Sequence, residues 1–288
     1  MNVIAAAADL AAMGLDPGLE DLVATLPRYR SGDAFAPAPG HRKRYFDDNA
    51  WLGLVSLRLF RRSGNDEHVR RASELLRFVR RGEVPQGGVL WVEGSGSRNA
   101  CSTAPAAELA VSLHLHRPDP EAIAFAGRSV EWLRRTLGRE DGLIADHIEH
   151  DTVEPTVWSY NQGAASGAHR LLARAAHDPP AVSVARRTEQ ASLELFDNER
   201  LWREPPPFLA VWFRELLAVE DDGVRGLAQG RLSSYLDRVT REARDPRTGL
   251  FTAGGVGSYD GRSTIDQAGF VQLFALGDGV EPAPAGAP

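Results

Sequence analysis

Residues 44–62 read RYFDDNAWLGLVSLRLFRR, in which two adjacent carboxylates, Asp47 and Asp48, precede an apolar segment. From Asp48 to Arg62 the apolar residues recur at the three- and four-residue spacing of one helix face, which predicts an α-helix. Aspartate is favoured at a helix start, because its carboxylate accepts hydrogen bonds from backbone N–H groups that lack a partner within the helix. The pair therefore has a structural explanation against which any functional one must be weighed.

The surroundings of the pair favour a second interpretation. Tyr45, Phe46 and Trp51 flank the two acids. Two carboxyl groups a few ångströms apart repel each other when both are ionised, so one keeps its proton while the other is charged. Cleavage of a glycosidic bond uses that combination, an acid that protonates the leaving oxygen and a carboxylate at the anomeric carbon.

The same helical period recurs over most of the chain, with little of the alternation that indicates strands. We therefore predict a nearly all-α fold with about eleven helices, at residues 3–13, 18–26, 48–62, 66–81, 105–115, 120–137, 160–176, 181–196, 208–218, 222–243 and 264–276. Pro105 falls in a region where we expect it to delay the start of the helix or to kink it.

The connectors between these helices alternate in length. Short turns that contain Pro or Gly, such as residues 63–65 and 117–120, follow one helix of each pair, and long loops at 82–98 and 138–158 follow the other. In a ring of helical hairpins this alternation places the long loops at one end, where they can converge on a site.

Composition limits the possible partners. The 288 residues carry a formal net charge of -6 without a basic block, which argues against nucleic acid or an anionic membrane as a partner. No uncharged run is long enough to span a bilayer, and the first 26 residues lack the basic start of a signal peptide, so we expect a cytoplasmic protein. The single Cys101 excludes an internal disulfide and favours a small packed residue.

Four segments together resemble glycoside hydrolase family 76, the α-1,6-mannanases and their relatives. Residues 45–51, YFDDNAW, are similar to the family's aromatic-Asp-Asp-x-x-Trp signature. Residues 87–91, GGVLW, and the following Arg98-Asn99-Ala100 are similar to its Gly-Gly-Val-x-Trp and Lys-Asn-Ala stretch.

The other two segments lie further along the chain. Residues 142–146, GLIAD, lead to WSYNQG at 158–163, the most specific match, which resembles Trp-Thr-Tyr-Asn-Gln-Gly at the head of a central helix. Residues 208–214, FLAVWFR, resemble a late helix that presents an arginine. The order and spacing of all four segments agree with the family over roughly residues 45–276.

The resemblance implies a single (α/α)6 barrel, a ring of helical hairpins, over residues 1–280, with a disordered tail at 281–288. The segment before Asp47 is short, so we expect a trimmed first hairpin. The implied activity is retaining hydrolysis of α-1,6-linked mannosides, in α-mannan or manno-oligosaccharides, with no metal and no cofactor. By position in the motif Asp47 is the nucleophile and Asp48 the acid/base, two roles that spacing alone does not distinguish.

The segments also indicate which side chains contact the sugar. Sugar hydroxyls are suitable partners for side chains that both donate and accept hydrogen bonds, and aromatic rings can stack on sugar faces. The predicted substrate-binding residues are Trp51, Trp91, Asn99, Asp146, Trp158, Tyr160, Asn161, Gln162 and Arg214. Each has a structural alternative: a tryptophan can belong to the core, an amide can cap a helix, and the arginine can pair with a structural acid.

Other functions stay open at this stage. A sugar epimerase-like enzyme on a similar helical barrel would use histidine as its acid/base in place of a carboxylate pair. A noncatalytic glycan-binding protein would keep the aromatic groove alone. Residues 146–151, DHIEHD, combine acids and imidazoles that can ligate a metal ion, although their spacing is not a recognised helical ligand pattern.

A carboxylate mechanism predicts that hydrolysis survives exhaustive chelation, because no metal takes part in it. The measurement is turnover of linear α-1,6-mannan before and after dialysis against EDTA. Loss of activity that a divalent cation restores would instead assign the reaction to a metal held by Asp146, His147 and His150.

Overall fold

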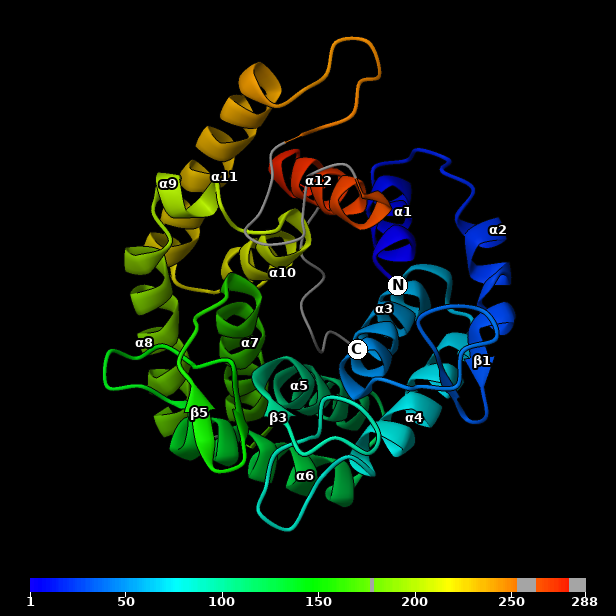
Figure 1. The fold of residues 1–288 in the computed structure, drawn as a ribbon, viewed down its shortest axis with the longest axis vertical. Coiled ribbons are helices and arrows are strands. Elements are labelled where there is room, and N and C mark those ends of the chain that lie inside the picture. Colours follow the sequence, from blue (N-terminus) through cyan, green and yellow to red (C-terminus); the bar gives the residue numbers. More distant parts are fainter. Residues whose placement is uncertain (177–178, 253–262, 280–288) are drawn as a thin grey trace.

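The computed structural model describes residues 1–176, 179–252 and 263–279, and the predicted tail at 281–288 lies outside these ranges. The helices form a ring that surrounds one axis, as Figure 1 shows in a view down that axis. Among the described residues, no helix is long and apolar enough to cross a bilayer.

The inner wall of the ring consists of alternate helices of the chain. Each packs against the next, and the last packs against the first, so that the ring closes where α12 meets α1 and α1 meets α3. These inner helices are α1 (Asn2–Ala12), α3 (Phe46–Ser63), α5 (Ala100–His116), α7 (Ser159–Ala176), α10 (Pro206–Leu217) and α12 (Thr264–Gly277).

The outer layer consists of helices that run back along the inner ones. Each packs against the inner helix that precedes it in the chain. The outer helices are α2 (Leu19–Ala24), α4 (Asp66–Arg80), α6 (Pro120–Trp132), α8 (Pro179–Leu195) and α11 (Asp222–Glu242), and a further short helix, α9 (Asn198–Leu201), joins α8 to α10. This arrangement confirms the predicted all-α barrel. Its first hairpin is the short one, because α2 has only 6 residues.

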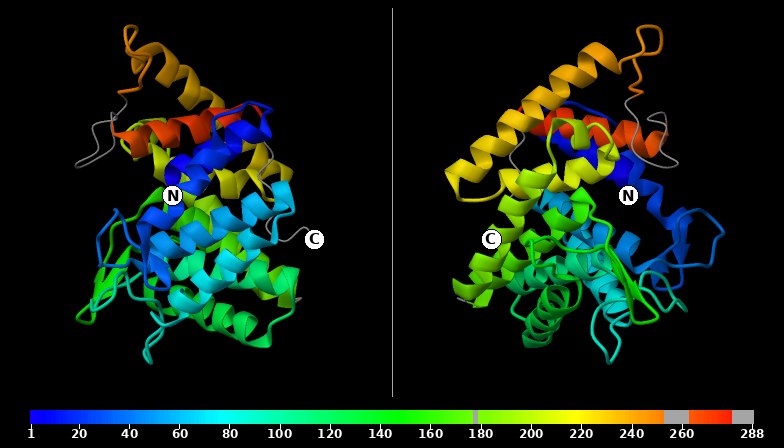
Figure 2. Two further views of the ribbon diagram at one scale, coloured as in Figure 1. Left: turned by 90° about the vertical axis from the view of Figure 1, so that its right-hand side faces the viewer. Right: turned by 60° about the vertical axis from the view of Figure 1, so that its left-hand side comes forward.

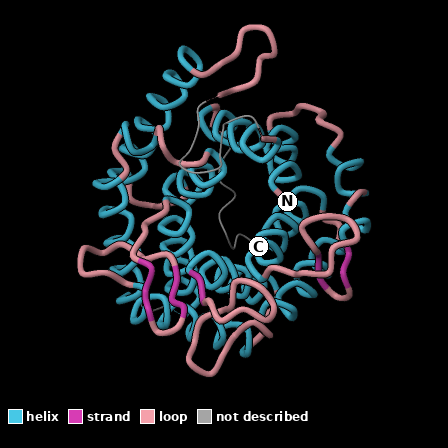
Figure 3. The backbone as a smooth tube through the Cα atoms, in the orientation of Figure 1, coloured by secondary structure: helices cyan, strands magenta, loops and turns pink. Residues whose placement is uncertain are grey.

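The described part of the chain contains five short strands, all of them in the loops (Figure 3). β1 (Arg30–Ser31) pairs with β2 (Ala34–Phe35), and β3 (Arg98–Asn99), β4 (His147–Glu149) and β5 (Thr152–Glu154) form an antiparallel sheet in that order. Arg98 is opposite Ile148 in this sheet, so the two long loops at 82–98 and 138–158 meet, as predicted. Figure 2 shows the β1–β2 and β4–β5 hairpins at the same end of the barrel.

The start of α5 differs from the prediction. The helix begins at Ala100, and Pro105 lies inside it, although proline removes one backbone hydrogen bond. Every residue from Ala100 to Leu113 is buried between neighbouring helices, and this burial outweighs the local cost of the proline. The predicted helix at 120–137 is α-helical only as far as Trp132, and its last turn, Leu133–Leu137, is a π-helix.

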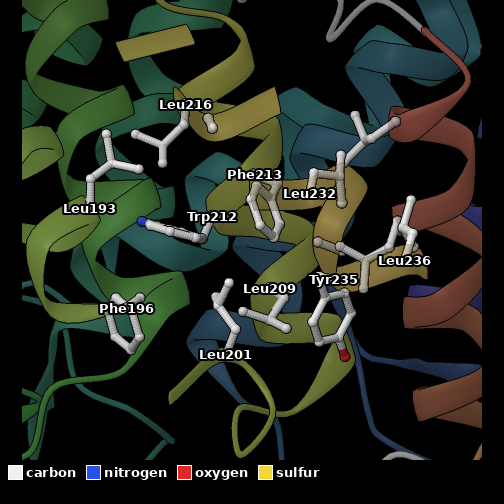
Figure 4. Close-up of a cluster of buried hydrophobic side chains, with 14 of the residues drawn as sticks. Leu193, Phe196, Leu201, Leu209, Trp212, Phe213, Leu216, Leu232, Tyr235 and Leu236 are labelled. Atoms are coloured by element: carbon white, nitrogen blue, oxygen red, sulfur yellow. The ribbon is translucent and has the colours of Figure 1, made fainter. Parts of the chain in front are cut away.

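A large buried cluster lies beside α10. Trp212 and Phe213 are in contact at a centroid distance of 4.8 Å with their rings tilted by 55°, and leucines from α10 and α11 surround them (Figure 4). The Trp212 Nε1–H donates to Ser192 Oγ at 3.0 Å, which satisfies the polar end of a fully buried ring. This cluster holds α10 against α8 and α11. The opposite face of α10 is thereby turned toward the barrel axis.

The close approach of α7 and α10 predicts a stability effect at Gly163. A Cβ at this position would lie 2.8 Å from the Trp212 Cα, a backbone atom that cannot yield. We expect Gly163→Ala to lower the free energy of unfolding by about 1–3 kcal/mol, measured by urea denaturation. Gly127 on α6 has nothing within 4 Å of an added Cβ, so Gly127→Ala is the matched control. It should be neutral or stabilise by up to about 1 kcal/mol, and equal effects of the two substitutions would contradict the packing argument.

Candidate active site

A cavity of about 780 Å³ opens at one end of the barrel. Its wall includes a residue from the first turn of every inner helix, namely Asn2, Asp47, Cys101, Tyr160, Pro207 and Ile265. The inner helices therefore all direct their N-termini toward the cavity, and the positive ends of the helix dipoles converge there. This field favours negative charge on a carboxylate, and the chain places two carboxylates in it.

Asp47 is held by three hydrogen-bond donors. Its Oδ1 accepts from the Asp48 backbone N–H at 2.8 Å, and its Oδ2 accepts from Trp91 Nε1 at 3.0 Å. The Cys101 Sγ also faces this Oδ2, at 3.7 Å. The Phe46 N–H donates to the Trp91 carbonyl at 2.9 Å, which fixes the loop that carries the indole to the start of α3. The orientation of Asp47 is thus set by both neighbouring and distant residues.

Asp48 has a different environment. Its residue is exposed to solvent in the cavity, and its carboxyl accepts no hydrogen bond from the part of the chain that the structure describes. A carboxyl in that position can turn toward a bound molecule. Asp47 is therefore held in one orientation, whereas Asp48 is available to contact a bound molecule.

The two acids titrate together. Burial and, next, the neighbouring Asp48 carboxylate raise the pKa of Asp47 to about 7. The protein atoms around the cavity also raise the pKa of Asp48, although its side chain is open to the cavity. Adjacent coupled carboxyls keep one proton between them, and the three donors to Asp47 stabilise its ionised form. The pair therefore holds one shared proton up to about pH 7.

The sheet contributes a third carboxylate, Asp146, to the cavity wall. Its Oδ1 accepts from Asn161 Nδ2 at 2.9 Å, and its Oδ2 lies 2.9 Å from His147 Nδ1. The Ala100 N–H donates to the Asp146 carbonyl at 2.8 Å, which joins this strand to the start of α5. Asp146 is thus oriented as a fixed acceptor that faces the same space as the aspartate pair.

Several predicted substrate-binding residues do lie together. Trp51, Trp91, Asn99, Asp146, Tyr160 and Arg214 all line the cavity. Trp91 is 41% exposed, which leaves a ring face open to a ligand. Arg214 also has the structural partner considered as the alternative, because its Nη2 lies 2.6 Å from the buried Asp9 Oδ2.

Three predicted residues are not part of the cavity wall. Gln162 is 1% exposed, and its amide bonds the backbone of Ile144 in both directions at 2.8 Å, so it has a structural role in place of the predicted substrate contact. Asn161 acts behind the wall, where it orients Asp146. Trp158 packs edge-on against Phe208 at 5.7 Å and supports that ring. The local motif did not distinguish which of its side chains point inward.

Other cavity residues were missed by the sequence analysis. Phe208 stacks on Tyr160 at a centroid distance of 4.0 Å, and Cys101, which we expected only to pack, also contacts Asp47. His147 lines the wall beside Asp146. Glu108 had a sequence signal, because it is the only charged residue between Ala100 and Leu113, and a polar residue in an otherwise apolar helix is informative.

The histidine-rich segment forms a hairpin. His150 and Asp151 have φ values of 48° and 59° and form the turn between β4 and β5, as two-residue hairpin turns require. Among residues 1–176, 179–252 and 263–279, no group of three or more His, Cys, Asp or Glu side chains is arranged to hold a metal ion.

A fixed and an available carboxyl that share one proton, inside a helical barrel, define the site of a glycoside hydrolase. The profile of glycosyl hydrolase family 76 matches residues 4–196, more than half of the chain. The chain therefore belongs to glycosyl hydrolase family 76. No curated protein sequence matches it.

Solved structures share its fold. The family 76 mannosidase Bt3792 from Bacteroides thetaiotaomicron VPI-5482 is 18% identical, with 96% of this chain and 84% of that chain covered and a TM-score of 0.79. An inactive α-1,6-mannanase variant, GH76A of Salegentibacter sp. HEL1_6 in complex with α-1,6-mannotriose, is 20% identical, with coverage of 97% and 89% and a TM-score of 0.79. A D-mannose isomerase is less similar, at 14% identity, coverage of 82% and 72% and a TM-score of 0.64.

The shared proton predicts a bell-shaped pH dependence. We expect kcat/KM to fall above about pH 7, where the pair loses its last proton, and to fall in acid, where both carboxyls of the pair are protonated. Trp91→Phe removes a donor to the ionised Asp47, which raises the pKa of that carboxyl, so the acid limb should move upward by about one pH unit. Trp51→Phe is the control, since no hydrogen bond joins Trp51 to Asp47. An acid limb that stays in place in Trp91→Phe would show that the indole does not tune the pair.

Proposed function

We propose that this glycoside hydrolase cleaves α-1,6-linked mannosides with retention of anomeric configuration, with Asp47 as nucleophile and Asp48 as acid/base. The observation that carries the proposal is the placement of the pair: Asp47 is fixed by three donors, and Asp48 is exposed beside it in the cavity. A nucleophile needs a fixed, ionised carboxylate, and an acid/base needs a proton and access to the leaving oxygen.

The reaction follows from these positions. Asp47 attacks the anomeric carbon while Asp48 gives its proton to the glycosidic oxygen, so the bond from the sugar to the leaving alcohol breaks and an ester to Asp47 forms. Asp48, now ionised, takes a proton from water. The resulting hydroxide equivalent attacks the anomeric carbon and releases Asp47, and both carboxyls return to their initial states.

The likeness to α-1,6-mannanases supports the substrate class. The Salegentibacter sp. HEL1_6 enzyme binds α-1,6-mannotriose as an inactive variant in which two adjacent aspartates are replaced by asparagine. An adjacent pair is also what this chain presents at Asp47 and Asp48. An epimerase-like enzyme would rely on histidine, and His147 is the one histidine on the cavity wall within the described residues.

The roles of the two acids can be separated by substitution. We expect Asp47→Asn and Asp48→Asn each to lower kcat on α-1,6-manno-oligosaccharides by at least about a hundredfold. On 2,4-dinitrophenyl α-mannoside, whose leaving group needs no protonation, Asp48→Asn should still release a burst of dinitrophenolate, and Asp47→Asn should not. The sugar product, followed by NMR, should appear first as the α-anomer.

Asp119→Asn is the matched control for this series. Asp119 caps α6 through its side chain, away from the cavity lining, and asparagine caps a helix equally well. Its activity should equal that of the unmodified protein. Near-normal turnover by either variant of the pair would contradict the mechanism, and first appearance of the β-anomer would assign inversion.

A further inference from the structure

The cavity continues along the barrel axis below the aspartate pair. On α3 its wall runs from Asp47 to Arg58, and on α5 from Cys101 to Glu108. At a rise of about 1.5 Å per residue, these stretches place its far end roughly 10–16 Å below the first turns of the helices. We call this lower part the deep chamber, and its wall contains Val55, Arg58, Glu108, Val211, Arg214 and Gln272.

A buried ion cluster lies beneath the chamber. Asp9 of α1 is 1% exposed and pairs with Arg58 of α3 through one oxygen and with Arg214 of α10 through the other. Both arginines that line the chamber therefore have a carboxylate partner, which they share.

Glu108 has no such partner. Glu108 is 6% exposed. Among the described residues, no hydrogen bond or ion pair reaches its carboxyl. Leaving a buried carboxyl without a partner is costly. Three other buried acids, Asp9, Glu189 and Glu215, are each paired with an arginine. Glu108 is thus a buried carboxyl on the chamber wall for which the described residues supply no hydrogen-bond partner.

The chemistry of the Glu108 carboxyl indicates what that partner is. Burial and, next, the charge of Glu215 raise its pKa well above the ordinary value, whereas the charges of Arg170, Arg61 and Arg214 act to lower it. A carboxyl accepts hydrogen bonds, and its protonated form also donates one, which matches the pattern of a sugar hydroxyl. Val55 and Val211 offer apolar surface on the same wall for the C–H faces of a pyranose ring.

We propose that the deep chamber is a binding site for mannosyl units remote from the scissile bond, with Glu108 as the hydrogen-bonding group for their hydroxyls. This proposal rests on the proposed function, because the catalytic pair lies at the upper end of the same cavity. Because the chamber ends at Asp9, it limits how many mannosyl units fit on that side of the scissile bond. The site therefore contributes to the preference of the enzyme for substrates of a certain chain length.

Binding and stability together test the role of Glu108. In the inactive Asp47→Asn, Asp48→Asn background, Glu108→Met should weaken binding of α-1,6-mannotetraose by about tenfold, measured by isothermal titration calorimetry. Glu108→Gln keeps the ability to donate and accept, so its Kd should stay within about threefold of the background. The Tm of Glu108→Met should be unchanged or raised, because the substitution removes an unpartnered buried polar group.

Glu189→Met is the matched control. Glu189 is equally buried but lies on the outer helix α8, outside the cavity lining, and pairs with Arg170 at 2.5 Å. This variant should lower the Tm and leave the Kd unchanged. A Glu108→Met protein with lower Tm and unaltered Kd would overturn the chamber proposal alone. A folded unmodified protein that neither binds nor cleaves α-1,6-mannotetraose would overturn both this proposal and the proposed function.

Discussion

The ring closes where α1 packs between α12 and α3, and buried Asp9 is a polar contact that joins α1 there to two other inner helices. One carboxylate pairs with Arg58 and Arg214, which come from two other inner helices. An unpaired charge at this depth would be strongly destabilising, so the three side chains have to be assembled together. The register of α1, α3 and α10 along the axis depends on that contact, and so does the level at which the cavity ends.

The closed ring also fixes the direction in which the inner helices run. Because each inner helix is followed by an outer one that returns, the inner helices are parallel, and their first turns meet at one end. The converging dipoles favour anions at that end, whereas burial opposes charge on the same carboxyls. Burial and, next, repulsion from Asp48 raise the pKa of Asp47 to about 7, against the hydrogen bonds from the Asp48 N–H, Trp91 and Cys101, which lower it. A fold that exposed the pair fully would lose the shared proton on which acid catalysis depends.

The long loops complete the site by pairing with each other. Trp91 arrives on the loop after α4 and donates to Asp47 across 44 positions of sequence, and the sheet sets Asp146 beside His147 and Asn161. Gly87 and Gly88 have positive φ values, and any Cβ there would meet the Trp132 ring at 2.6 Å. The glycines of the GGVLW segment thus serve loop packing, which in turn holds Trp91 over the pair.

Sequence alone determined the helices, the alternation of short and long connectors, and the aspartate pair at a helix start, because these depend on local period, turn residues and capping. Through the motif segments it also identified eight residues that line the cavity, namely Asp47, Asp48, Trp51, Trp91, Asn99, Asp146, Tyr160 and Arg214. The tertiary structure decided which side chains of a motif face inward: Tyr160 reaches the cavity, whereas Gln162 bonds the backbone of Ile144 behind it. It alone placed Pro105 inside a helix, where burial on all sides outweighs a lost hydrogen bond, and Glu108 on the chamber wall without a hydrogen-bond partner among the described residues. Those outcomes depend on what packs against each residue from distant parts of the chain, and local sequence carries no information about those neighbours.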